Sequence, residues 1–455
     1  MKKLIKSAAW LLVIGSFFFF GCENVTNLLD RLGIDNGSNT IDESGNDSGS
    51  GTNPSDGTGG DDGIFHGNES PAADTGTHVY IYGNYDDGTN WFAYYWKDGV
   101  RSPLPVAGAM ETSVHGVAEA ADGTRYEAGE YWDNTYIDKA CYWTDEANCR
   151  VIANGSAIAI TTNAGIVYVL GHSYDKDSNN NYQYWYWKSG TGKSTPLVLS
   201  SSSVPNESGI RYYPQSIAAY GNNVYVVGYY VHSAMPGSER TACYWDTYGN
   251  CCDLGDNACA YDAVFQNGQL YIAGGYNEGY NYYFGEDTVW MGCYWGGPNL
   301  KWIAFTNGAD TTSMARASSI TTDNRLLYLG GYYVHTDGSR NACYWQVDVN
   351  NLVYVNAKGT KTNQKENNIE GDRTDLPGMS TDTDAFVHDI AVSGGEVYAV
   401  GEYYPSVAGY ADEEDYYNEE QIDPNAAGKV CYWTDGVIHK LDDATEVCGI
   451  EVVTH

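Results

Sequence analysis

The sequence predicts an all-β fold, a seven-bladed β-propeller with four strands per blade; its composition, its repeat and its hairpin turns lead to this prediction. The 455 residues include 53 Gly, 41 Tyr and 13 Trp, a composition that favours strands joined by glycine turns over helices. Similar units of roughly 50 residues follow one another, which is the spacing of propeller blades. Asp-Gly turns inside the units are typical of tight hairpins.

Two motifs define the repeat, and each occurs seven times. The first reads Val-Tyr-x-x-Gly and the second Cys-Tyr-Trp, with variation at single positions. The glycine of the first motif falls at Gly83, Gly129, Gly171, Gly228, Gly274, Gly330 and Gly401. The Tyr-Trp pair of the second falls at Tyr95-Trp96, Tyr142-Trp143, Tyr186-Trp187, Tyr244-Trp245, Tyr294-Trp295, Tyr344-Trp345 and Tyr432-Trp433. Seven occurrences of both motifs predict seven blades.

Two further strands complete each predicted unit. A small apolar strand, such as Ala157–Ile160, precedes the Val-Tyr strand, and a fourth strand follows turns such as Lys97-Asp98-Gly99. The first unit starts at Val79 without its small apolar strand, whereas the chain has a spare one at Val447–Val452. We therefore expect the C-terminal strand to complete the first blade, close the ring and cover its edges.

The predicted insertions gather on one face. In a four-stranded meander the 2–3 and 4–1 connections share a face, and the long segments fall there: 172–184, 276–291, 402–429, 200–213 and 356–384. These loops are rich in tyrosine, which supplies rigid amphipathic contact area. We expect ligand contacts from the tyrosines deep in the insertions, which are Tyr280, Tyr282, Tyr283, Tyr416 and Tyr417. Tyrosine pairs directly after the motif glycine, such as Tyr229-Tyr230, are expected to extend the second strand instead.

The N-terminus predicts export and lipid anchoring. Lys2, Lys3 and Lys6 precede an apolar stretch, Ala8–Phe20, that is too short to span a bilayer and suits a signal peptide. The following Gly21-Cys22 resembles the lipobox of bacterial lipoproteins, in which the cysteine is acylated; an ordinary signal peptide with an incidental cysteine is the alternative. The predicted domains are a signal peptide (1–21), the acylated Cys22 with a flexible Gly/Ser/Asn/Asp tether (22–76) and the propeller (77–455). Acyl chains would hold the protein at a bacterial membrane, with the outer membrane or cell surface favoured.

Charge limits the partners. Lys and Arg number 24 against 59 Asp and Glu, a formal net charge of −35, which argues against nucleic acid because that affinity depends on basic residues neutralising phosphates. We expect a monomer whose partner, besides the membrane, is a protein or a glycan.

The strand order and the Val-Tyr-x-x-Gly motif resemble kelch-like propellers, whose paired glycines appear at Gly274-Gly275 and Gly330-Gly331. The Ala-Cys-Tyr-Trp form is similar to propeller lipoproteins of spirochaetes and related anaerobes. This resemblance covers about residues 79–455 and implies the fold, with little about activity.

Candidate metal and disulfide sites are few. Alignment of the small apolar strands puts His388, Cys448 and His115 in one column, on neighbouring blades, with Ala157, Ser216, Tyr261 and Ser318 as the other members. Two imidazoles and a thiolate suit zinc, with Asp389 or Glu451 to orient a ligand, whereas packing between blades is the alternative. Asp175–Asn181 spaces oxygen ligands like a partial calcium loop or is simply a solvated loop. Cys141 and Cys149, like Cys243 and Cys251, flank hairpins at the same spacing, so either disulfides or free thiols are consistent with the sequence.

These observations favour a binding or adhesion module that uses the tyrosine-rich face. No linear catalytic motif stands out, and a glycosidase or lyase with loop carboxylates at the mouth of the propeller channel is the alternative function.

Overall fold

The computed structural model describes residues 76–454 apart from several short segments. The gaps are 135–136, 147–148, 175–181, 192, 198, 200–209, 233–239, 278–289, 297–300, 306–314, 324–325, 335–338, 351–353, 356–367, 370–371, 379–383, 405–428, 435 and 442–443. The chain divides into two compact units, Met1–Asp74 and Thr75–His455, and the described residues belong to the second. Nowhere in them is there a helix with the length and apolar character needed to cross a bilayer.

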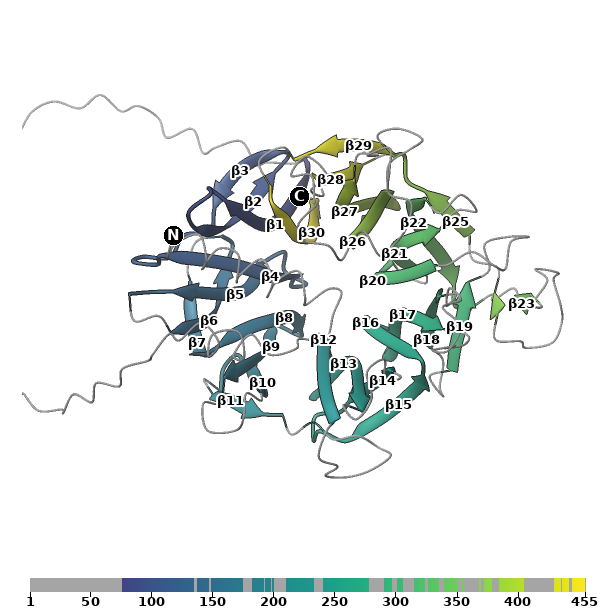
Figure 1. Ribbon diagram of the computed structural model, residues 1–455, viewed down its shortest axis with the longest axis horizontal. Helices are drawn as coiled ribbons and strands as arrows, with labels where there is room; N and C mark the ends of the chain where they lie inside the picture. The colour runs from purple at the N-terminus through teal and green to yellow at the C-terminus, as the bar shows by residue number, and fades with distance from the viewer. Residues whose placement is uncertain are drawn as a thin grey trace, which may run out of the picture. The chain divides into compact units, whose positions relative to one another are not determined.

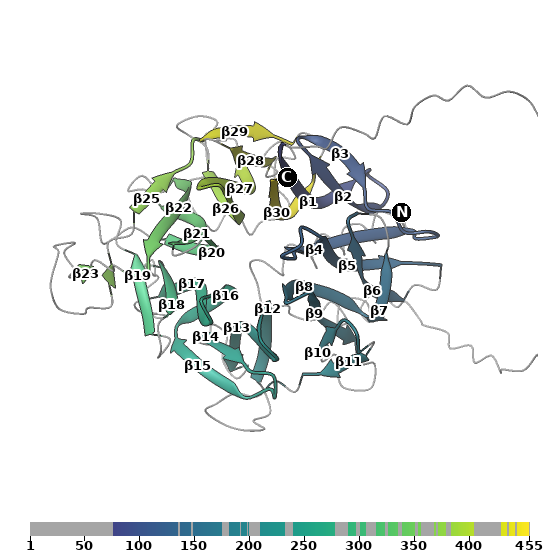
Figure 2. The same cartoon turned by 180° about the vertical axis from the view of Figure 1, so that it is seen from behind.

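Seven antiparallel sheets of four blade strands stand in a ring, with one strand of each sheet facing the central axis (Figures 1 and 2). From the axis outward, blade 1 consists of β30 (Glu446–Thr454), β1 (Thr77–Asp86), β2 (Trp91–Lys97) and β3 (Val100–Pro103). Blade 2 consists of β4 (Glu111–Glu119), β5 (Arg125–Trp132), β6 (Asp138–Thr144) and β7 (Arg150–Asn154). Blade 3 consists of β8 (Ser156–Asn163), β9 (Ile166–Tyr174), β10 (Tyr182–Lys188) and β11 (Lys193–Pro196). The predicted all-β, seven-bladed propeller is confirmed.

Blades 4 to 7 repeat this order. Blade 4 consists of β12 (Ile210–Tyr220), β13 (Asn223–His232), β14 (Arg240–Trp245) and β15 (Cys251–Asp256), and blade 5 of β16 (Ala258–Gln266), β17 (Gln269–Asn277), β18 (Trp290–Gly296) and β19 (Lys301–Phe305). Blade 6 consists of β20 (Ala315–Asp323), β21 (Leu326–Val334), β22 (Arg340–Asp348) and β25 (Asp372–Asp375), and blade 7 of β26 (Asp384–Ser393), β27 (Glu396–Tyr404), β28 (Lys429–Thr434) and β29 (Val437–Lys440).

The predicted assignment of one insertion was wrong. The segment 356–384 was expected to be a 4–1 connection, but the fourth strand of blade 6 is β25, so the long insertion lies between β22 and β25. Two short strands inside it, β23 (Tyr354–Val355) and β24 (Asn368–Ile369), extend blade 5, where β24 pairs in parallel with its outer strand β19. The inserted chain thereby covers what would be an open edge of blade 5.

The C-terminal strand closes the ring as predicted. β30 pairs with β1 in antiparallel register from Thr77 opposite Thr454 to Asn84 opposite Glu446. Ile81 on β1 and Ile450 on β30 are both buried in the core that they share with blade 7. Blade 1 is therefore built from both ends of the propeller sequence.

Each inner strand contains a β-bulge, and the bulge explains the motif glycine. The ladder between the first and second strands skips one residue in all seven blades, for example between Val114 and Gly116 in β4. A Cβ at Gly129 on the neighbouring strand would lie against the carbonyl oxygen of Ser113. The equivalent glycine in blade 6 is Gly331, opposite Cys343 and against the Arg316 carbonyl, so the predicted Gly330 was one residue early.

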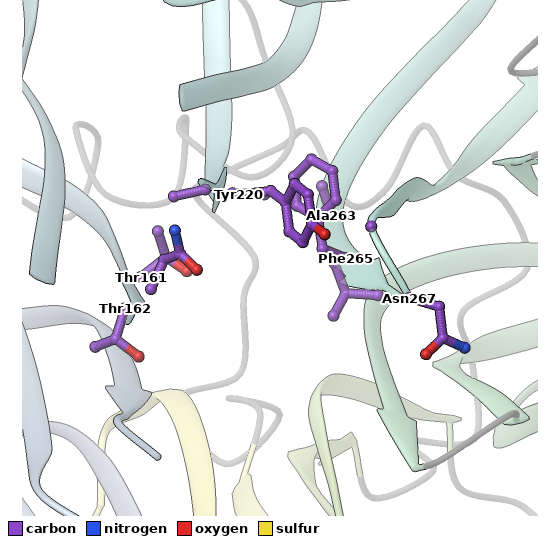
Figure 3. Close-up of a pocket in the computed structure, with 11 residues that line it drawn as sticks. Thr161, Thr162, Tyr220, Ala263, Phe265 and Asn267 are labelled. Carbon is purple, nitrogen blue, oxygen red and sulfur yellow. The ribbon is translucent and has the colours of Figure 1, made fainter. Parts of the chain in front are cut away.

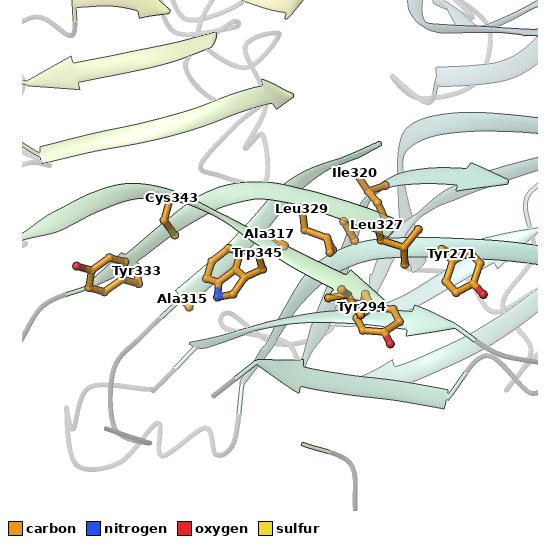
Figure 4. Packing of buried hydrophobic residues seen from close by; sticks show 12 residues of the cluster. Tyr271, Tyr294, Ala315, Ala317, Ile320, Leu327, Leu329, Tyr333, Cys343 and Trp345 are labelled. Atoms are coloured by element: carbon orange, nitrogen blue, oxygen red, sulfur yellow. The ribbon is translucent and has the colours of Figure 1, made fainter. Parts of the chain in front are cut away.

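The Cys-Tyr-Trp motif forms the core between blades. The tryptophan is at most 7 % exposed in every blade, and the five motif cysteines are fully buried. In Figure 4, Trp345 and Cys343 of blade 6 pack with Leu329 and with Tyr271 and Tyr294 of blade 5. Loss of such a buried tryptophan side chain costs about 3–5 kcal/mol, so the motif is retained because it joins neighbouring blades.

Candidate functional site

Several predicted site residues lie outside the described part of the chain. These are Cys22, the ligand-contact tyrosines Tyr280, Tyr282, Tyr283, Tyr416 and Tyr417, and the calcium-loop segment 175–181. The tyrosine pairs after the motif glycine are described, and they lie in strands as predicted: Tyr230, Tyr333 and Tyr403 are buried, whereas their neighbours Tyr229, Tyr332 and Tyr404 are partly exposed.

His115, His388 and Cys448 occupy the bulge position of β4, β26 and β30, so the predicted column is real for these three. In blades 3 and 4 the predicted column residues, Ala157 and Ser216, were each wrong by one position. The bulge residues there are Ile158 and Gln215. A bulge shifts which residue faces a given side, and the sequence pattern alone does not mark where it begins.

The three column residues have separate partners. His388 Nε2 lies 3.4 Å from Glu402 Oε1, His115 Nε2 lies 3.9 Å from Glu130 Oε1, and the Cys448 thiol donates to the Tyr82 carbonyl at 3.5 Å. In the described ranges, no group of three or more His, Cys, Asp and Glu side chains is placed to hold a metal ion. The structure does not bring these three residues together as a zinc ligand set.

In each of the two His–Glu pairs, the contact shifts the pKa of both side chains. Burial by itself would lower the pKa of His388, but Glu402 beside it outweighs burial and raises that pKa; Glu130 does the same for His115. Burial would raise the pKa of each glutamate, yet the facing histidine lowers it. Both pairs therefore favour imidazolium and carboxylate together, and each side chain remains between 10 % and 27 % exposed.

Asp389, considered above as a metal-orienting residue, has a structural role. Its Oδ1 accepts from the Ser319 hydroxyl at 2.6 Å and its Oδ2 from the Ile450 amide at 2.9 Å. Asp262 makes similar contacts, with the Ser216 hydroxyl at 2.8 Å and the Ile320 amide at 3.0 Å. These two carboxylates link the inner strands of blades 4 to 7 and blade 1, and burial raises the pKa of Asp389 to about 6.

The paired cysteines are free thiols in the structure. Cys141 and Cys149 influence each other's pKa, as Cys251 influences that of Cys243, and the Cys251 thiol donates to Asp253 Oδ1 at 3.6 Å. Burial raises the pKa of Cys141, and the neighbouring Cys141 lowers that of Cys149. The predicted disulfides thus have neighbouring thiols to form from, and their oxidation stays a prediction.

Sequence reasoning missed a cluster of arginines and tyrosines on blades 4 to 6. We call it the Arg–Tyr cluster; its members are Tyr213, Tyr229, Arg240, Cys259, Tyr261, Arg316 and Tyr332. The Arg316 guanidinium lies 3.8 Å above the Tyr261 ring, and Arg240 lies 5.4 Å from the Tyr229 ring centroid. Arg240 also donates to the Cys259 sulfur at 3.7 Å.

The two guanidinium groups have no acidic partner among the residues that the structure describes. Across the described ranges, neither Arg316 nor Arg240 forms an ion pair with a carboxylate, and the buried Arg316 Nε has no hydrogen-bond acceptor. This is unexpected in a chain with 59 acidic and 24 basic residues. Other arginines do have such partners, as Arg125 has in Glu146 and Arg373 in Asp375.

The cluster and the His388–Glu402 pair form one continuous wall. Tyr332 packs edge-on against Phe386 with ring centroids 5.0 Å apart, and Phe386 packs edge-on against Tyr404 at 5.7 Å. The Tyr404 hydroxyl then donates to Glu402 Oε2 at 2.8 Å. The charge of Arg316 also reaches His388, whose pKa it lowers against the larger effect of Glu402.

These residues lie on the side of the inner strands where the 2–3 and 4–1 connections meet, which we call the long-loop side. Arg316 is the second residue of β20, close to the preceding 4–1 connection, and Glu402 lies near the end of β27, before a 2–3 connection. The signal in the sequence was positional. The residue after the motif glycine and the residue two before the bulge vary between repeats and are polar in most of them, as Glu130, Glu402 and Arg316 show.

A pocket lies at the opposite end of the inner strands, among the 1–2 turns of blades 3 to 5 (Figure 3). Its volume is about 360 Å³, and Tyr220 stacks on Phe265 there at 5.2 Å. Its lining of threonine, asparagine, alanine and aromatic side chains contains no charged group. It offers less chemistry than the long-loop side, which presents cations, carboxylates and phenols together.

Comparisons with known proteins find distant similarities among solved structures. No family model matches the chain, and no curated protein matches it. Solved structures similar to it include the β-propeller domain of the Trilobed protease from Pyrococcus furiosus, with a TM-score of 0.44, 10% identity and 81% of this chain and 94% of that one covered. A PL25 ulvan lyase bound to -[GlcA(1-4)Rha3S]- has a TM-score of 0.40 and 11% identity over 73% and 91%. The fucose-specific lectin from Aleuria aurantia has a TM-score of 0.33 and 13% identity over 73% and 95%. These are likenesses of fold alone.

Proposed function

We propose that this protein is an exported, lipid-anchored binding module that takes its ligand on the long-loop side of the propeller. The observation that carries the proposal is the Arg–Tyr cluster. It places two cations, neither of which pairs with a carboxylate in the described part of the chain, among partly exposed tyrosines on the long-loop side. Binding sites commonly combine convergent polar groups with a rigid scaffold that holds them.

The proposed setting follows from the N-terminal sequence. Acylation at Cys22 would anchor the chain, and the polar tether would hold the propeller away from the membrane surface. A tethered module with variable loops and a polar inner wall suits recognition of envelope or extracellular material. Protease treatment of intact cells tests the surface location, because a periplasmic protein would be protected.

A second function is favoured by the His388–Glu402 pair. A histidine whose pKa is raised by a carboxylate, next to phenol groups, is suited to proton transfer on a bound sugar. The alternative is therefore a glycosidase or lyase that acts on the ligand held by the Arg–Tyr cluster.

One experiment separates the two functions. The purified full chain in detergent is assayed on panels of glycans and extracellular proteins and, in parallel, for glycosidase and lyase turnover. We expect saturable binding that Tyr332→Ala weakens and Tyr220→Ala, on the opposite face, leaves unchanged. Turnover that is lost in Glu402→Gln with binding retained would establish the enzyme instead, and equal loss in both tyrosine variants would refute the location of the site.

A further inference from the structure

We propose that the Arg–Tyr cluster binds the carboxylate of an acidic sugar, with Arg316 as its principal contact. This inference rests on the proposed function and specifies its ligand. The argument proceeds from the charge of the cluster, to its hydrogen-bonding character, to the surroundings of the bound group.

The positive charge of the two guanidinium groups favours binding of an anion. Removing a guanidinium group from water without a counter-ion is costly, and Arg316 and Arg240 are both partly buried without a carboxylate. Stacking over Tyr261 and Tyr229 offsets part of this cost. The stacked rings do not cover the edges of the guanidinium groups. These edges carry the N–H donors that pair with planar anions such as carboxylates.

The cluster offers donors and few acceptors. Burial raises the pKa values of Tyr229 and Tyr261, so both phenols keep their protons at neutral pH. Arg316 lies over Tyr261, and Arg240 bonds to Cys259, two residues earlier in the same strand β16, so the two guanidinium groups flank one strand. A carboxylate accepts several such bonds at once.

The surroundings favour a single negative charge. Glu402 lies on the adjoining blade 7, Glu446 and Glu130 follow on blades 1 and 2, and Glu446 influences the pKa of both His115 and His388. A phosphate or sulfate ester on a densely charged polymer would be repelled by these carboxylates and by the net charge of −35. One carboxylate per sugar residue adds the least repulsion.

The polar wall favours a sugar over a peptide. On blade 7, Glu402 accepts from the Tyr404 hydroxyl and lies 3.4 Å from His388 Nε2, so the wall next to the cluster carries acceptors and donors side by side. Sugar hydroxyls both donate and accept, and they match such a wall. Phe386 is the apolar side chain of this part of the wall, where it packs between Tyr332 and Tyr404.

The test uses D-glucuronate as probe, titrated into the purified full chain in detergent and followed by saturation-transfer NMR or calorimetry. D-glucose, methyl glucuronate ester, N-acetylalanine and inorganic sulfate are the comparison ligands. We expect glucuronate to bind best, and Arg316→Gln to weaken it about 10- to 100-fold, the range for loss of a hydrogen bond to a charged group. Arg373→Gln is the matched control, because Arg373 also lies over a tyrosine in blade 6 but pairs with Asp375.

Other results overturn the inference. Equal affinity for glucuronate and its ester, preference for sulfate or for N-acetylalanine, or unchanged binding in Arg316→Gln would each do so. If Arg316→Gln fails to fold, the comparison of acid and ester on the unaltered protein decides. Binding of neutral glycans that Tyr332→Ala weakens would leave the proposed function standing while this inference falls, whereas the absence of binding to any glycan or protein would remove both.

Discussion

Glu127→Gln tests whether a buried carboxyl makes the propeller less stable at neutral pH. Glu127 lies in β5 with its side chain fully buried, and both of its oxygens lack a hydrogen-bond partner. The charge of Arg125 offsets that of Glu127 only in part, because Arg125 is already paired with Glu146 through bonds of 2.8 and 3.1 Å. The Tyr82 hydroxyl also donates to Glu146 rather than to Glu127.

The magnitude follows from the pKa. Burial, and after it the charge of Glu146, raises the pKa of Glu127 from 4.5 to about 8. The folded protein therefore holds a proton that the unfolded chain releases between these pH values, so stability falls as pH rises through this window. The slope is about 1.4 kcal/mol per pH unit. Relative to a neutral glutamine, the loss is about 3 kcal/mol at pH 7, and it vanishes near pH 4.5.

The assay is urea unfolding of both proteins at pH 5, 6, 7 and 8, followed by tryptophan fluorescence. We expect Glu127→Gln to be more stable by an amount that grows with pH. Glu130→Gln, three residues further along β5, is the control of opposite sign: His115 lowers the Glu130 pKa despite burial, so its removal should destabilise at neutral pH. A stability difference for Glu127→Gln that does not change with pH would refute the reasoning.

Four further outcomes are expected. Deletion of residues 447–455 should leave the inner edge of β1 without a partner strand and cause aggregation, seen by light scattering; a soluble, equally heat-stable monomer would contradict ring closure. Gly129→Ala should lower the free energy of unfolding by about 1–3 kcal/mol, measured by denaturation, because its Cβ meets the Ser113 carbonyl. Cys22→Ser should release the protein from the membrane fraction or leave the precursor uncleaved, and unchanged detergent partitioning would count against acylation. Thiol alkylation before and after reduction should show Cys141 bridged to Cys149 in exported protein, and full labelling without reductant would show free thiols.

The fold was predictable because its determinants are local and repeated. The Val-Tyr-x-x-Gly and Cys-Tyr-Trp motifs recur because the same glycine must pass the same bulge and the same tryptophan must fill the same space between blades. A spare strand at the C-terminus also implied closure. Two predictions about blade 6 were wrong. Its paired glycines, Gly330 and Gly331, did not show which of them faces the bulge. Its fourth strand, β25, follows a long insertion that pairs with blade 5.

The candidate site was largely unpredictable for a physical reason. Arg240, Arg316, Tyr261 and His388 come from four consecutive blades, and only the packing of these blades and the bulges bring their side chains to one wall. Their sequence separation gives no motif. The sequence shows that an acidic residue or a histidine often follows the motif glycine. Which of these side chains face one another depends on a one-residue bulge, and the alternation of buried and exposed residues along a strand does not locate that bulge.

Ring closure has a consequence for the folding kinetics. Blades 2 to 7 each form from one stretch of sequence, but blade 1 joins Thr77 to Thr454 across 377 positions. Contact order of this kind slows folding, because the chain entropy of bringing distant segments together is lost before the new ladder is gained. During synthesis, β1 has no partner on its inner side until β30 emerges, so we expect a six-bladed intermediate with an open strand edge. The rate at which the last strand docks then sets how long that edge is available to a chaperone or to a second chain.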